Sequence, residues 1–135
     1  MTKLMVIGGF LGAGKTTAMI EAAKTLKKIG NTVGLITNDQ TDYLVDTQYV
    51  EYHDLEVTEL TGSCFCCNYP GFAERVNTMR QEDFILAEPV GSCTDLVSTI
   101  MKPSKEGKAG ELDVLPLSVL VEPGRLKDFM EDNTN

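Results

Sequence analysis

The sequence predicts an α/β fold in three layers, in which helices cover both faces of a mostly parallel sheet. Short apolar runs of strand length recur along the chain, and strands that are buried on both faces have this composition. Segments with helical spacing alternate with these runs, which favours parallel pairing. A glycine-rich segment also separates the first apolar run from the first helical segment.

The first half of the chain supplies three strands and one long helix. Residues 4–7 form an apolar run that predicts the first strand, and residues 16–29 carry apolar side chains at helical spacing. Residues 33–37 predict a second strand, which a polar loop over residues 38–47 follows. Residues 55–60 alternate weakly and predict a third strand.

The second half is predicted to repeat the alternation of helix and strand. Apolar residues at helical spacing predict a helix over residues 70–80, and residues 84–87 predict the fourth strand. The remaining expectations are a short helix over residues 94–101 that Pro103 ends, a loop over residues 103–110, a last strand over residues 115–121 and a terminal helix that begins near Pro123.

Composition limits the classes of function. The 135 residues suit one compact domain, and a hydrophobic content of 42% can fill a core. The net charge of -8 argues against binding to nucleic acid or to an anionic membrane, because both carry phosphate charge. No apolar run approaches the roughly 18 residues of a membrane span, and the start shows no signal-peptide pattern. We therefore expect a cytoplasmic protein.

The glycine-rich segment over residues 9–16 fits the phosphate-binding pattern G-x-x-x-x-G-K-[ST] at every fixed position. Its glycines let successive N–H groups point at phosphates, and the following helix adds its positive end. Lys15 should contact the β- and γ-phosphates, and the Thr16 hydroxyl should bind Mg²⁺. The pattern predicts a P-loop nucleoside triphosphatase. The predicted nucleotide-binding residues are Gly9, Gly12, Ala13, Gly14, Lys15, Thr16 and Thr17.

Polar residues after the second and fourth strands should face the same phosphates, because ligands bind at the carboxyl ends of parallel strands. Asp39 and Glu88 carry carboxylates that can hold Mg²⁺ or its waters, and the Gly91 N–H can contact the γ-phosphate. The alternative for Asp39 is a turn residue. Asp42 and Asp46 are interpreted as solvated loop acids.

Three of the four cysteines lie within four residues, at Cys64, Cys66 and Cys67. Such clustering in a cytosolic chain indicates metal binding or redox chemistry, and thiolates favour ions such as Zn²⁺. The alternative is that they are small residues buried beside a loop. Three thiolates leave a tetrahedral ion one ligand short, and the candidates for the fourth are Cys93, Glu59, His53 or water.

Residues 8–17 (GGFLGAGKTT) and 59–67 (ELTGSCFCC) together resemble the CobW-type metallochaperone GTPases, whose relatives include the urease and hydrogenase nickel-insertion GTPases. The resemblance implies that GTP hydrolysis with Mg²⁺ drives delivery of Zn²⁺, Co²⁺ or Ni²⁺ to a receiving protein or cofactor pathway. It implies catalytic roles for Lys15, Asp39 and Glu88, with Gly91 sensing the γ-phosphate. The implied metal ligands are Thr16, Asp39 and Glu88 for Mg²⁺, and Cys64, Cys66 and Cys67 for the transition metal.

The sequence also departs from this family. The guanine-recognition element Asn-Lys-x-Asp does not occur in it, and Pro89 follows Glu88 where an N–H would be expected. We interpret residues 1–135 as a P-loop nucleotide-binding (G) domain that is incomplete at its C-terminus. The alternatives are an ATPase or kinase with structural cysteines, a nickel-insertion GTPase and a non-catalytic binding module. Association into a homodimer is a further expectation.

Overall fold

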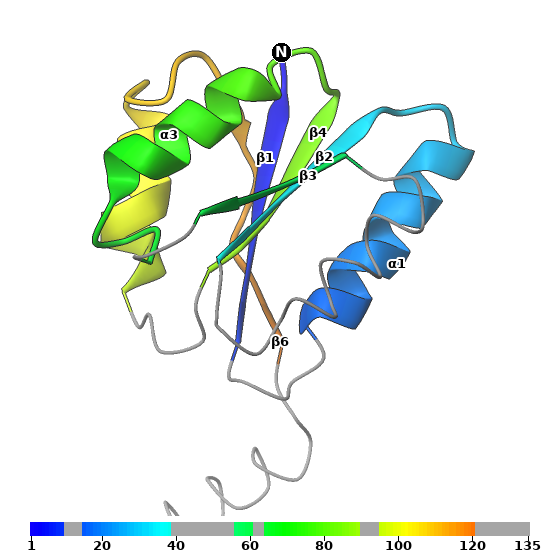
Figure 1. Ribbon diagram of the computed structural model, residues 1–135, viewed down its shortest axis with the longest axis horizontal. Coiled ribbons are helices and arrows are strands. Elements are labelled where there is room, and N and C mark those ends of the chain that lie inside the picture. The colour runs from blue at the N-terminus through cyan, green and yellow to red at the C-terminus, as the bar shows by residue number, and fades with distance from the viewer. Residues whose placement is uncertain (10–14, 39–55, 61–63, 90–94, 121–135) are drawn as a thin grey trace, which may run out of the picture.

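The computed structural model describes residues 1–9, 15–38, 56–60, 64–89 and 95–120, with the backbone alone for residues 15–17 and 120. It confirms the predicted α/β fold, in which a six-stranded sheet lies between helices (Figure 1). Every described strand pair is parallel. No helix within these residues has the length and apolar content that crossing a membrane requires.

The strands run in the order β3-β2-β4-β1-β5, and β6 also pairs with β1. Their bounds are Lys3–Gly9 for β1, Val33–Asn38 for β2, Glu56–Leu60 for β3, Phe84–Glu88 for β4, Asp113–Val114 for β5 and Ser118–Leu120 for β6. The predicted first, second and fourth strands, β1, β2 and β4, are therefore neighbours. Their carboxyl ends lie at one edge of the sheet, where the sequence predicts the nucleotide site.

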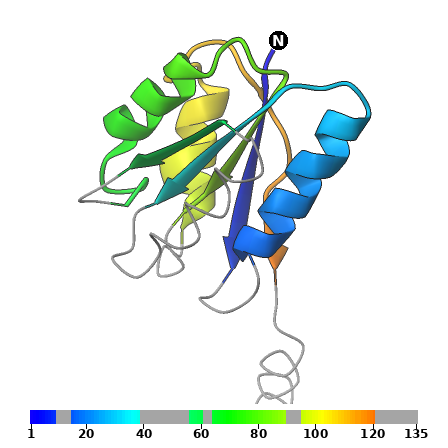
Figure 2. The ribbon, with the colours of Figure 1, turned by 45° about the vertical axis from the view of Figure 1, so that its right-hand side comes forward.

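Helices cover both faces of this sheet (Figure 2). On one face lies α1, Lys15–Lys28. The opposite face carries α3, Tyr69–Thr78, together with the π-helical segment η1, Val97–Met101, which continues into α4, Lys102–Lys105. The helices predicted over residues 16–29 and 70–80 are confirmed to within two residues at each end.

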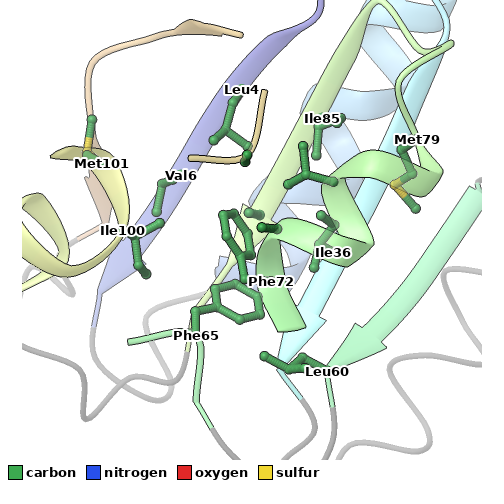
Figure 3. Close-up of a cluster of buried hydrophobic side chains, with 14 of the residues drawn as sticks. Leu4, Val6, Ile36, Leu60, Phe65, Phe72, Met79, Ile85, Ile100 and Met101 are labelled. Carbon is green, nitrogen blue, oxygen red and sulfur yellow. The ribbon is translucent and has the colours of Figure 1, made fainter. Parts of the chain in front are cut away.

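Alternating strand residues fill two separate cores. Leu35 of β2 and Leu86 of β4 pack with Met19 and Ile20 of α1. Their sequence neighbours Ile36 and Ile85 enter the opposite core, which Figure 3 shows with α3 above the sheet. Because side chains alternate across a strand, each strand serves both cores, and continuous apolar composition is the result.

The prediction of one last strand over residues 115–121 is wrong, because β5 and β6 are separated at residues 115–117. β5 pairs Asp113 with Lys3, whereas β6 pairs Ser118 with Ile7, so the chain opposite β1 holds one extra residue. Pro116 lies in this break and has no N–H for the ladder. Val121 and the terminal helix predicted from Pro123 lie outside the described residues.

Pro103 does not end its helix, and residues 103–105, which were predicted to lie in a loop, belong to α4. The Lys102 N–H donates to the Val97 carbonyl, five residues earlier, so the helix widens just before the proline. Pro103 then lies in the first turn of α4, where a missing N–H costs little. The Ser104 hydroxyl donates to the Ile100 carbonyl at 2.7 Å and supplies a further bond in this turn.

Candidate functional site

The chain leaves β1 toward α1 through two glycines that have different steric roles. A Cβ added at Gly8 would lie 2.8 Å from the Leu96 Cδ1 atom. Gly9 has φ of 142°, in a region that residues with a side chain rarely adopt. α1 begins at Lys15, at the same edge of the sheet. Its first N–H groups therefore form a positive helix end beside the segment predicted to hold phosphate.

Thr37 of β2 and Glu88 of β4 are polar residues at the same edge of the sheet as this helix end. Thr37 pairs in register with Glu88, the last residue of β4. Both lie two residues beyond the leucines that pack against α1, so both face α1 rather than α3. The Thr37 Oγ1 atom is buried, and it has no hydrogen-bond partner within the described part of the chain. An orphaned hydroxyl beside a carboxylate fits a place for bound Mg²⁺ and its waters.

Several residues predicted to bind the nucleotide, or Mg²⁺ beside it, lie outside the described residues. These are Gly12, Ala13, Gly14, Asp39 and Gly91. The backbone of Lys15, Thr16 and Thr17 lies in the first turn of α1, as the P-loop pattern requires. Of the three predicted catalytic residues, Glu88 is placed with its side chain at the carboxyl edge.

The cysteine segment forms a single turn between β3 and α3. The Asn68 N–H donates to the Cys64 carbonyl at 3.0 Å and closes this turn. It brings together the sulfur atoms of Cys64, Cys66 and Cys67, all of which lie within 4.8 Å of one another. None of the three is in a disulfide. The predicted grouping of these cysteines in space is thus present, and Cys67 is the most exposed of them.

The spacing of the sulfur atoms fits a shared ion. Zinc–sulfur bonds of about 2.3 Å in a tetrahedron place the sulfurs about 3.8 Å apart. The Cys64 and Cys66 Sγ atoms are 2.9 Å apart, and the widest separation is below 4.8 Å. Adjustments of about 1 Å would therefore seat the ion. Such a site would also release the crowding of three thiols, because a bound metal replaces their protons.

This crowding changes the acidity of the exposed thiol. A hydrogen bond with Cys64, a second with Cys66 and repulsion from both sulfurs raise the pKa of Cys67 to about 11. Without an ion the turn therefore keeps Cys67 protonated at neutral pH. A thiolate is the form that binds metal, so a bound cation must displace this proton.

Phe65 and Asn38, which the sequence analysis did not single out, hold the cysteine turn in place. The Phe65 ring is fully buried and packs against Phe72 of α3 with ring centroids 4.8 Å apart (Figure 3). The Phe65 N–H donates to the Asn38 Oδ1 atom at 3.0 Å. An aromatic residue between two cysteines was the available signal for this anchor, because a metal ligand pattern does not require it.

The helix after the turn is fixed at its start and along one side. Asn68 caps α3, because its Oδ1 atom accepts from the Gly71 N–H at 3.1 Å. Arg75 donates from Nε to the Glu59 carbonyl at 3.2 Å and connects the helix to the end of β3. The turn is thereby held between two rigid elements.

The structure narrows the set of candidates for a fourth metal ligand. Among the described residues, the three thiols form the metal-binding group without a carboxylate. Glu59 lies one residue before Leu60, whose side chain enters the core beneath α3, so the Glu59 side chain faces away from α3. Cys93 and His53, together with Asp42 and Asp46, lie outside the described residues.

The parallel sheet, the glycine exit from β1 and the helix that begins at Lys15 define the class of P-loop nucleoside triphosphatase folds. Residues 3–120 match the family described as CobW/HypB/UreG, nucleotide-binding domain. This match spans most of the chain, and the chain belongs to that family. The resemblance predicted from the sequence is confirmed.

Solved structures agree on the fold at low sequence identity. The signal recognition particle receptor FtsY from Elizabethkingia anophelis has a TM-score of 0.69 and 15% identity over 99% of this chain and 46% of its own. The hydrogenase maturation factor HypB from Archaeoglobus fulgidus has a TM-score of 0.67 and 16% identity over 97% of this chain and 59% of its own.

A third similar structure is FlhF complexed with GMPPNP/Mg(2+), with a TM-score of 0.58 and 15% identity over 96% of this chain and 50% of its own. The chain therefore spans between 46% and 59% of the length of these three proteins. A comparison with curated proteins finds no match.

Proposed function

We propose that the chain is the nucleotide-binding domain of a GTPase that binds zinc or cobalt and uses GTP hydrolysis to deliver the metal to a target protein or cofactor pathway. One observation carries the proposal. Three thiols that are not in disulfides gather within 4.8 Å of one another between β3 and α3, and the carboxyl end of β3 lies at the same edge as those of β1, β2 and β4. A metal site and a phosphate site can therefore share one edge of one sheet.

The proposed roles follow from position and chemistry. The N–H groups of residues 9–17 bind the phosphates, Lys15 neutralises their charge and Thr16 binds Mg²⁺. Asp39 and Glu88 orient Mg²⁺ and the attacking water, and Gly91 senses the γ-phosphate. Cys64, Cys66 and Cys67 bind the transition metal ion, which is the cargo, because thiolates favour soft or borderline cations. The family match and the likeness to HypB support this assignment.

GTP turnover with and without Zn²⁺ or Co²⁺ tests the proposal. We expect the metal to change turnover in the native chain and to have no effect on turnover in Cys66→Ala. Lys15→Ala should abolish nucleotide binding while leaving metal binding intact. GTP turnover that is unchanged by either metal and by Cys66→Ala would contradict the proposed role in metal delivery.

An ATPase or kinase with structural cysteines is the second candidate, because the 135 residues contain no Asn-Lys-x-Asp element for guanine recognition. Competition between GTP and ATP for one fluorescent nucleotide separates the two candidates. GTP should displace the probe at lower concentration than ATP. A preference for ATP together with no zinc binding at micromolar concentration would favour the second candidate.

The setting we propose is the cytoplasm, with a metal-receiving protein as partner and no nucleic acid or membrane lipid as ligand. We further propose a homodimer and a nickel-binding alternative at the same thiols. Sedimentation with GDP and with a GTP analogue tests the dimer. Displacement of Zn²⁺ by Ni²⁺ at equal concentration would favour nickel as the cargo.

A further inference from the structure

Asn38, the last residue of β2, connects three segments through one side chain. It is 8% exposed, although it is polar. Its Nδ2 atom donates to the carbonyl of Leu60, the last residue of β3, at 3.3 Å. Its Oδ1 atom accepts from the Phe65 N–H, in the middle of the cysteine turn, at 3.0 Å.

These two bonds need an uncharged amide. Asn supplies a donor and an acceptor on one short, stiff side chain, and both partners are backbone groups of fixed polarity. Aspartate has the same shape but only acceptors, so it would repel the Leu60 carbonyl. The bond to Phe65 is also close to two thiols, because Phe65 lies between Cys64 and Cys66. A shift of Asn38 must therefore move the metal turn.

The residue before Asn38 faces the predicted phosphate site. Thr37, the preceding residue, carries the orphaned hydroxyl that faces α1 beside Glu88. The end of β2 thus has one residue turned toward the nucleotide and the next turned toward the metal, because consecutive strand residues point to opposite faces.

We propose that Asn38 is the positioning residue that links the nucleotide state to the geometry of the metal site. This inference rests on the proposed function. A change at Mg²⁺ that moves the end of β2 is transmitted by the Asn38 amide to the Phe65 N–H, and the spacing of the three thiols changes with it. Metal affinity therefore depends on which nucleotide is bound, and nucleotide affinity depends on the metal by the same factor.

The test compares zinc affinities in two nucleotide states. Zn²⁺ is titrated against a chelating indicator with the chain saturated by Mg²⁺–GDP or by Mg²⁺–GMPPNP. The expected ratio of the two zinc affinities is about fivefold or more in the native chain. It should fall to near one in Asn38→Asp. Asn31→Asp makes the same charge change before the opposite end of β2 and should keep the native ratio.

Nucleotide affinity measured with and without Zn²⁺ is the second readout, and it should lose its zinc dependence in Asn38→Asp alone. Asn38→Ser, which keeps one hydrogen-bonding group, replaces Asn38→Asp if circular dichroism shows that the latter does not fold. A native ratio near one, or an unchanged ratio in the Asn38 variant, overturns the inference although both ligands bind. Absence of zinc or nucleotide binding in the native chain overturns the proposed function as well.

Discussion

Thr37 carries a hydroxyl that neither the sheet nor α1 satisfies. Its Oγ1 atom is buried and has no partner among the described residues. A buried hydroxyl without a hydrogen bond loses its hydration and gains nothing in return, which costs about 1–3 kcal/mol. A residue of this kind is retained where a ligand or its waters can supply the missing partner.

We therefore predict that Thr37→Val increases the free energy of unfolding by about 1 kcal/mol in the absence of ligand. Valine keeps the β-branched shape and removes the unsatisfied oxygen. Urea unfolding of both proteins measures the change. Thr25→Val is the control, because the Thr25 hydroxyl donates to the Glu21 carbonyl at 2.9 Å and its loss should not stabilise α1. A destabilised Thr37→Val would contradict the prediction.

At the residue scale, sequence reasoning found the reactive groups but not the groups that hold them. Cys64, Cys66 and Cys67 were recognised from their chemistry and spacing, and the structure gathers them. Asn38 was interpreted as part of a polar loop, whereas it is buried at the end of β2. Its partners are backbone groups 22 and 27 residues away in sequence, and no local pattern indicates contacts at that distance.

At the scale of elements, the cysteine turn depends on a ring inserted beneath α3. Phe65→Leu should lower the free energy of unfolding by about 1–3 kcal/mol and weaken zinc binding, because the turn loses its fit against Phe72. Phe72→Leu removes the other ring of this pair and leaves Phe65 in the turn. It should cost similar stability while zinc binding changes less. Calorimetry and zinc titration measure the two effects. Equal zinc affinities in the two variants would contradict the prediction that Phe65 positions the thiols.

A carboxylate pair lies at the opposite end of β3. The hydrogen bond with Glu82 raises the pKa of Glu56 above its ordinary value of 4.5, with burial and repulsion from Glu82 as smaller causes. The folded state thus binds this proton more tightly than the unfolded state does. The resulting stabilisation is present below about pH 4.5 and is lost as the pH rises through the folded pKa.

We predict that Glu82→Gln removes this pH dependence. Between about pH 4 and pH 7, the melting temperature of the native chain should fall relative to that of the variant, because two carboxylates then face each other. Glu74→Gln, on the exposed side of α3, removes a charge elsewhere and should follow the native profile. Parallel profiles for the native chain and Glu82→Gln would contradict this prediction.

Elements with a strong apolar pattern were predicted well, whereas the segments around Pro103 and Pro116 were not. β1, β2 and β4 lie within one or two residues of their expected bounds, because burial on both faces marks them clearly. Pro103 and Pro116 were assigned opposite effects from those observed. Pro103 was expected to end a helix that continues, and Pro116 was placed inside a strand that it interrupts. Proline fixes φ and lacks an N–H, and the hydrogen bonds around it decide whether the helix or strand ends there.

For the whole molecule, the central strands belong to both cores, so the two ligand sites share one sheet. α1 and its core support the predicted phosphate edge, while α3 and the other core support the metal turn. Neither core can form alone, because Ile36 and Leu35 are adjacent on β2 and face opposite layers. The domain should therefore unfold in a single transition.

The last prediction follows from this shared sheet. Mg²⁺–GDP and Zn²⁺, each at about 100 times its dissociation constant, should each raise the free energy of unfolding by about 2.7 kcal/mol. Lys15→Ala should lose the nucleotide contribution alone, and Cys66→Ser the zinc contribution alone. Calorimetry should record one transition that moves upward with either ligand. Two transitions, each responding to one ligand, would mean that the layers unfold separately, and a linkage through Asn38 would then have no common structure to act on.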